Sequence, residues 1–128
     1  MAWLARFAQP IYAVLRIVAG FLFFCHGGQK ILGLFGGHAG PSNGMVAASG
    51  WIELVAGILI AIGLFTSIAA FISSGEMAVA YFMVHASQGT WPIENHGELA
   101  VVYCFLFLYM AAAGSGPWSV DAMIRARR

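Results

Sequence analysis

The sequence predicts an all-α membrane protein, an antiparallel bundle of four transmembrane helices. The first observation is composition: of 128 residues, 61% are apolar and 9% are charged, whereas soluble domains are about 45–50% apolar and about 25% charged. The second is that the apolar residues gather in four runs, each long enough to cross a hydrocarbon core of ~30 Å, the fourth only just. At this length we expect a single domain over residues 1–128.

Each expected helix has a boundary signal. Pro10 suits the first turn of the first helix, because no backbone N–H is needed there. Thr66 and Asn95 are expected to cap the third and fourth helices with their side-chain oxygens. A cleavable signal peptide is a poorer explanation of the first run, which is too long and contains Arg16. The expected helices are residues 10–34, 44–64, 66–86 and 96–113, followed by a tail over 114–128.

The connections and the arginines predict the topology. Segments 35–43 and 87–95 are rich in turn-forming residues, so we expect both to lie outside the membrane as loops. Four crossings place both termini on one side. Arginines lie near both ends of the chain, and the positive-inside bias therefore assigns that side to the cytoplasm.

Several functional classes have little support in the sequence. The net charge is +1 with no basic stripe, which argues against a nucleic-acid partner. No zinc-finger spacing, P-loop or G-x-G-x-x-G motif is present. Cys25 and Cys104 lie in apolar runs and are interpreted as packing residues. A metal or haem site at His26, His85 and His96 is less favoured, because the histidines lack the usual ligand spacing.

Polar residues inside the apolar runs are the candidates for function, because a charge facing lipid is costly. Helical periodicity places them on one face of each helix, which predicts a bundle with a polar interior. These faces are Tyr12, Arg16, Gly20, Phe23, Gly27 and Lys30; Ser49, Glu53 and Gly57; Ala69, Ser73, Glu76 and Ala80; and Glu98, Val102, Phe105 and Tyr109.

Two of these residues are acids near the expected midplane. Glu53 and Glu76 each lie ~14–15 Å from the end of their helix. We expect Arg16 to reach one carboxylate and neutralise it, leaving the other to hold a proton. Such an acid can move protons or protonate a reduced carbonyl, as in a quinone. The alternative is a salt-bridge network that only fixes the register of the helices.

Several motifs along the chain resemble those of a known family. They are Arg16 with Gly20 and H-G-G-x-K over 26–30, the G-W-I-E-L segment that opens 50–66, G-E-M-A-x-A-Y-F over 75–82, N-x-G-E-L-A over 95–100, and G-P-W-S-x-D over 116–121. Together they resemble the DoxX family of small bacterial membrane proteins. The resemblance implies a four-helix membrane fold. It also suggests redox chemistry, since relatives are linked to thiosulfate–quinone oxidation and to thiol-stress complexes. It carries no catalytic assignment.

The leading hypothesis is therefore a bacterial inner-membrane protein that binds a quinone or a redox partner protein through a polar cavity open to the outer side. Two alternatives stay open: a non-enzymatic anchor or assembly subunit, and, less favoured, a small-molecule or proton transporter. A homo-oligomer also stays open. The candidate catalytic acids are Glu53 and Glu76, and the candidate substrate-binding residues are Arg16, His26, Lys30, His85 and Glu98.

Overall fold

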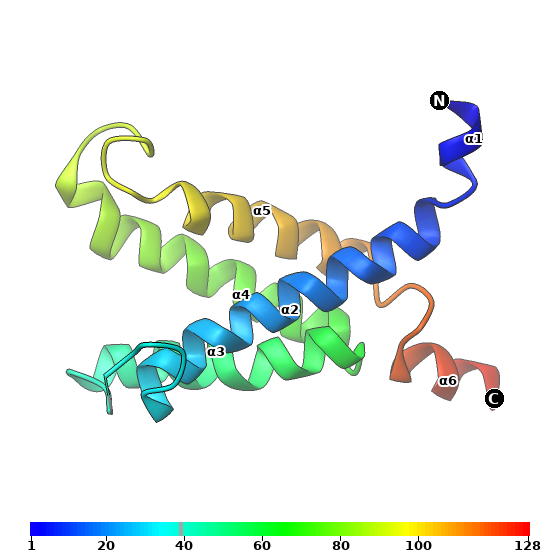
Figure 1. Ribbon diagram of the computed structural model, residues 1–128, viewed down its shortest axis with the longest axis horizontal. Helices are drawn as coiled ribbons and strands as arrows, with labels where there is room; N and C mark the ends of the chain where they lie inside the picture. The colour runs from blue at the N-terminus through cyan, green and yellow to red at the C-terminus, as the bar shows by residue number, and fades with distance from the viewer. Residues whose placement is uncertain (39) are drawn as a thin grey trace.

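The computed structural model describes residues 1–38 and 40–128, and within these residues all regular structure is helical (Figure 1). Four of the α-helices, α2 to α5, are long and apolar, whereas α1 and α6 are short pieces near the ends of the chain and η1 and η2 are single turns that follow α4. The elements are α1 (Ala2–Ala5), α2 (Ala8–Leu32), α3 (Gly44–Ile62), α4 (Thr66–Ala80), η1 (Tyr81–His85), η2 (Ala86–Gln88), α5 (Glu98–Ala113) and α6 (Val120–Ala126).

The bundle consists of two helical hairpins. In one, α2 packs along α3, and in the other α4 packs along α5, while α3 and α4 touch each other much less (Figure 1). The third of the expected helices corresponds to α4. It continues past Ala80, because a π-helical turn (η1) and a 3-10 turn (η2) extend it to Gln88. The sparse contact between α3 and α4 leaves room for a cavity between the two hairpins.

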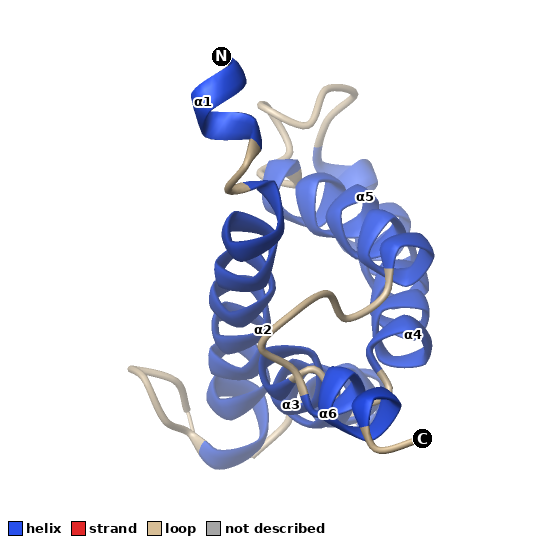
Figure 2. Ribbon diagram, turned by 90° about the vertical axis from the view of Figure 1, so that its right-hand side faces the viewer, coloured by secondary structure: helices blue, strands red, loops and turns tan. Residues whose placement is uncertain are grey.

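The two ends of the bundle differ. Both termini lie at one end of its long axis, and the loops that follow α2 and η2 lie at the other (Figure 1). Viewed from the terminal end, the loop between α5 and α6 crosses the middle of the helices (Figure 2). We call these the terminal end and the loop end.

The outer surface of the bundle is apolar. Three helices, Ala8–Leu32, Gly44–Ile62 and Thr66–Gln88, are long and apolar enough to cross a membrane, and Glu98–Ala113 is a shorter apolar helix. Their outward faces carry large exposed side chains such as Phe71 (66%) and Phe82 (72%). Lipid accounts for these faces, because soluble proteins rarely expose so much contiguous apolar surface.

Small residues bring α2 and α3 into backbone contact. A Cβ atom added to Gly57 would lie 2.5 Å from the backbone nitrogen of Phe24 and 2.8 Å from the carbonyl oxygen of Gly20. Gly27 meets the backbone of Gly50 in the same way. The predicted inward faces of the first two helices are confirmed, and the close approach is that of small-residue packing in membranes.

An aromatic cluster closes the middle of the bundle between α2 and α5. The ring of Phe23 lies 4.8 Å from that of Phe107 and 5.6 Å from that of Tyr103, centroid to centroid. All three side chains are buried. The cluster joins the two hairpins and forms the floor of the space at the loop end.

The fourth of the expected helices, α5, turns a different face towards the interior of the bundle from the one predicted. Glu98, Val102, Phe105 and Tyr109 are all exposed, and Tyr103, Phe107 and Met110 are buried with Ala100. The prediction used Glu98 to choose the inward face. Glu98 lies in the first turn of α5, at the loop end, where a carboxylate can remain exposed. The rest of the helix is apolar all round, so periodicity could not correct the choice.

The start of α4 is capped by a residue near the C-terminus of the chain. Thr66 was expected to cap it, but the Asp121 carboxylate accepts hydrogen bonds from the backbone N–H groups of Phe65 (3.0 Å) and Thr66 (3.1 Å). Burial would raise the pKa of Asp121, but these hydrogen bonds and the charge of Arg125 outweigh it and hold the pKa below its usual value. The tail that follows α5 contains the short helix α6, and the first turn of α6 anchors α4.

Candidate functional site

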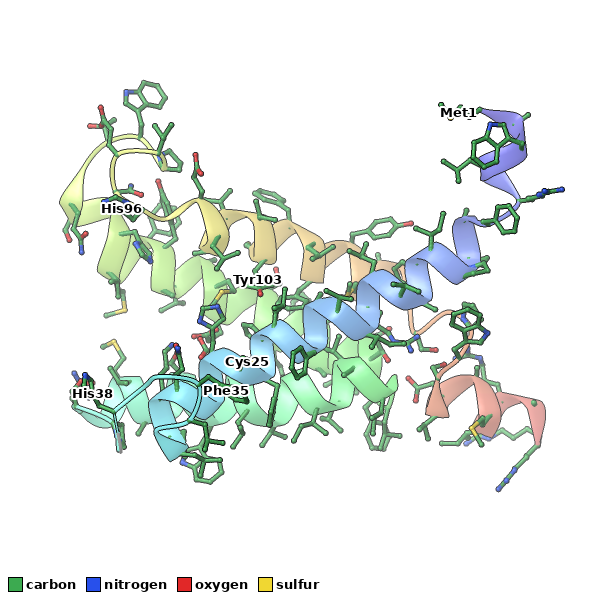
Figure 3. The ribbon with its side chains drawn as sticks, in the orientation of Figure 1. Met1, Cys25, Phe35, His38, His96 and Tyr103 are labelled. Atoms are coloured by element: carbon green, nitrogen blue, oxygen red, sulfur yellow. The ribbon has the colours of Figure 1, made fainter. Side chains whose placement is uncertain are left out.

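A cavity of about 750 Å³ lies between the two hairpins at the loop end. This volume is within the ~300–1,000 Å³ range of ligand pockets. His96 marks the rim at the loop end, and Tyr103 lies deeper, towards the middle of the bundle (Figure 3). Several exposed apolar residues also line it, among them Met45 on α3 and Ile72 and Val79 on α4. The cavity therefore opens sideways between α3 and α4, towards lipid.

Four polar side chains from three helices form a connected chain in the wall of the cavity. The Lys30 Nζ atom lies 2.7 Å from Glu53 Oε1 and donates a hydrogen bond of 2.9 Å to Ser49 Oγ. The Ser49 hydroxyl donates in turn to Glu76 Oε1 at 2.6 Å. Glu53 is 2% exposed, whereas the side chain of Lys30 is 34% exposed. The ammonium group therefore pairs directly with Glu53, and the Ser49 hydroxyl links it to Glu76.

The charge of this cluster is not balanced when every group is ionised. It contains two carboxylates, Glu53 and Glu76, and one ammonium group, Lys30. Within the part of the chain that the structure describes, the Oε2 atoms of both acids are buried and accept no hydrogen bond. Buried polar atoms are nearly always satisfied. A proton held by one of the two acids would balance the charge of this cluster.

The expectation that Arg16 neutralises one of the acids is wrong. Its guanidinium lies at the terminal end and donates to backbone carbonyls, including those of Ile60 (3.0 Å) and Trp118 (2.7 Å). The reason is the register between α2 and α3. Gly20 lies opposite Gly57, so Arg16, one turn earlier in α2, lies opposite the last turn of α3. Glu53 is about two turns further along α3, ~11 Å away.

The other predicted residues divide into two groups. His26 and His85 line the cavity together with Lys30, Glu53 and Glu76. Glu98 is exposed and is not among the lining residues. Ser49 was predicted on the inward face but was not selected as a site residue. Its position four residues before Glu53 was the available signal, because i and i+4 are neighbours on a helix.

His85 is held at the rim by the loop that follows it. Its Nδ1 atom lies 3.0 Å from the carbonyl oxygen of Asn95. Because a carbonyl can only accept, Nδ1 is the donor in this contact, and in the neutral imidazole Nε2 is then the acceptor. Asn95 does not cap α5 as expected. Its fully buried side chain bonds the Tyr81 hydroxyl (3.2 Å), the Gly89 carbonyl and the Gly97 N–H, and so fixes the loop.

Other chemistry is less developed in the described residues. Among them, no three His, Cys, Asp or Glu side chains gather closely enough to hold a metal ion. Cys25 and Cys104 are free thiols, and both are half-buried.

The comparisons with known proteins identify the family. The DoxX family model matches residues 11–86, which cover most of α2 and all of α3, α4 and η1. The chain belongs to the DoxX family. The stretch matched by the DoxX model contains all four members of the polar chain, Lys30, Ser49, Glu53 and Glu76. The protein is accordingly an integral, multi-pass membrane protein.

A relative from Haemophilus influenzae is 42% identical over 125 residues, covering 92% of this chain and 93% of the relative. That protein is described as an "Uncharacterized protein", so it adds no activity to the family assignment. No solved structure matches this DoxX protein.

Proposed function

We propose that this DoxX protein crosses the bacterial inner membrane four times, with both termini in the cytoplasm. Both termini lie at the same end of the bundle, and that end carries Arg6, Arg125, Arg127 and Arg128 (Figure 1). The positive-inside bias assigns it to the cytoplasm. The 16 residues of α5 span ~24 Å, which suffices for a crossing if its ends lie near the interface. The cavity then opens in the outer half of the membrane.

We further propose that the cavity binds the head group of a quinone or quinol. The observation that carries this proposal is the chain Lys30–Glu53–Ser49–Glu76 in an otherwise apolar cavity that opens towards lipid. A quinone is a flat apolar ring with two oxygens, and it reaches its site from the bilayer. The aromatic floor offers the ring a surface, and Lys30 offers a carbonyl oxygen a donor.

The two acids suit the proton part of quinone chemistry. Reduction of a quinone to a quinol takes up two electrons and two protons, and oxidation releases them. In this proposal a redox partner protein exchanges the electrons. Glu53 and Glu76, which both line the cavity, give protons to the ligand oxygens or take them back. Water at the loop end restores the protons, past the Nε2 atom of His85.

The test is ligand binding by the purified protein in lipid nanodiscs. Glu76→Gln keeps the shape of the side chain but removes its charge and replaces one acceptor oxygen with a donor. We expect it to weaken quinol binding at least tenfold and to remove the pH dependence of binding. Glu98→Gln is the matched control, because Glu98 is exposed and outside the cavity. Equal binding by wild type and both variants would contradict the proposal.

A purely structural subunit is the second candidate, and the contacts of Arg16 favour it. This buried ion holds backbone carbonyls together, and an ionic group in this bundle can therefore be structural. If the polar chain has the same role, Glu53→Gln lowers the thermal stability of the protein, and neither quinone nor quinol binds the wild type.

A further inference from the structure

A second groove continues from the cavity along the seam between α3 and α4. It has a volume of about 580 Å³, and every residue that lines it is apolar. It extends from Trp51 and Ile52 on α3 to Phe65 at the turn into α4. On α3 the groove runs from Trp51 to Leu59, or ~12 Å along the helix axis.

The groove and the cavity share two of their walls. Ile52 on α3 and Ile72 on α4 line both spaces. Glu53 directly follows Ile52 on α3, and Glu76 lies one turn after Ile72 on α4. Both acids line the cavity and not the groove. A polar compartment and a wholly apolar one therefore meet between Ile52 and Ile72.

We propose that the ligand of the cavity carries a long hydrocarbon tail, and that the α3–α4 groove binds this tail. The head group then lies against Lys30, Glu53 and Glu76, the chain passes between Ile52 and Ile72, and the tail runs towards Phe65 at the terminal end. The seam is also the route by which the ligand enters from the bilayer. This inference rests on the proposed function, because it is the head group that holds the tail beside the groove.

Tethering explains why the tail, rather than any lipid chain, occupies the groove. A bulk acyl chain gains little by leaving its neighbours for an equally apolar surface, because lipid tails are as apolar as the groove. A tail attached to a bound head group is already held beside the groove, so its local concentration there is high. The tail should therefore add affinity beyond its partition into the bilayer.

The experiment compares two probes in nanodiscs, with the dissociation constant expressed as a mole fraction in the lipid. Both probes carry the same benzoquinol head, and only one carries an isoprenoid tail. We expect wild type to bind the tailed probe at least tenfold more tightly than the tailless one. Val55 lines the groove and is 50% exposed, so Val55→Trp fills the groove from the lipid side. It should abolish the preference and leave binding of the tailless probe unchanged.

Two further variants keep the test specific. Ile68→Trp fills the groove from α4, where Ile68 is 65% exposed, and should act as Val55→Trp does. Val102→Trp is the matched control, because Val102 is 60% exposed on α5 and lines neither space. It should leave the binding of both probes unchanged.

The outcomes separate this inference from the proposed function. If the tailless probe binds, but wild type shows no tail preference, the groove holds at most bulk lipid and the inference is overturned, while the proposed function stands. The same holds if the preference survives both Val55→Trp and Ile68→Trp. If neither probe binds, both the proposed function and the inference fail.

Discussion

Replacing Arg16 by methionine is expected to release the C-terminal segment from the bundle. Arg16 is fully buried, and its guanidinium donates to the carbonyls of Ser115, Pro117 and Trp118 in the loop before α6. It also donates to the carbonyl of Ile60 at the end of α3. Methionine is unbranched like the stem of arginine, is somewhat shorter, and has no donors. The substitution therefore removes the hydrogen bonds while largely keeping the volume.

The size of the effect follows from the number of carbonyls that lose their donor. A hydrogen bond from a charged donor contributes about 1.5–3 kcal/mol. Three loop carbonyls lose such a bond, but they regain part of it from water once the loop moves away. We therefore expect the free energy of unfolding to fall by about 3–5 kcal/mol, which is less than the full sum for three such hydrogen bonds.

The assay combines unfolding in mild detergent with hydrogen exchange of the backbone amides in residues 115–126. We expect faster exchange in this segment for Arg16→Met, and only partial recovery for Arg16→Lys, because an ammonium group cannot span the same carbonyls. Arg6→Met is the control, since it removes an exposed arginine at the same end. Exchange and stability that match this control would refute the reasoning.

Three further predictions concern the polar chain, the cap of α4 and the α2–α3 seam. Lys30→Met should lower the free energy of unfolding by about 1–3 kcal/mol, which is less than for a fully buried pair because Lys30 is partly exposed. Adding Glu53→Gln to this variant should restore much of the lost stability. Strictly additive effects in this double-mutant cycle would contradict the pairing. Folding lowers the pKa of Asp121, so the stability that its carboxylate gives the folded protein should be complete above the unfolded pKa of about 3.9 and be lost as the pH falls through the lower folded pKa. Acid unfolding of Asp121→Asn should lack this loss of stability. Identical acid titrations of wild type and Asp121→Asn would argue against the cap. Gly57→Ala should lower the free energy of unfolding by about 1–3 kcal/mol, because the new Cβ atom would meet the backbone of α2. Gly75→Ala is the control: a Cβ atom there would have nothing within 4 Å, so the variant should be as stable as wild type, or more stable, in thermal unfolding. Equal effects of the two variants would show that the close contact is absent.

The sequence determined the helices and most of their inward faces. Lipid excludes charge and demands long apolar segments, so composition and run length were sufficient to locate the helices. Periodicity placed Glu53, Glu76 and Lys30 on inward faces, because only one rotation of each helix hides its polar residues. It failed for α5, where Glu98 was the only polar marker and lay at an end that need not be buried.

Only the tertiary structure decided which of these groups meet. Periodicity fixes the rotation of a helix but not its axial offset from a neighbour, and an ion pair requires agreement within a few ångströms. The backbone contact at Gly20 and Gly57 sets that offset, and it gives Glu53 the ammonium of Lys30 instead of the guanidinium of Arg16. The cap of α4 by Asp121 joins residues 55 positions apart, a distance over which no local pattern carries information. The cavity and the groove likewise arise from how two hairpins splay apart, which depends on packing between helices rather than on any one of them.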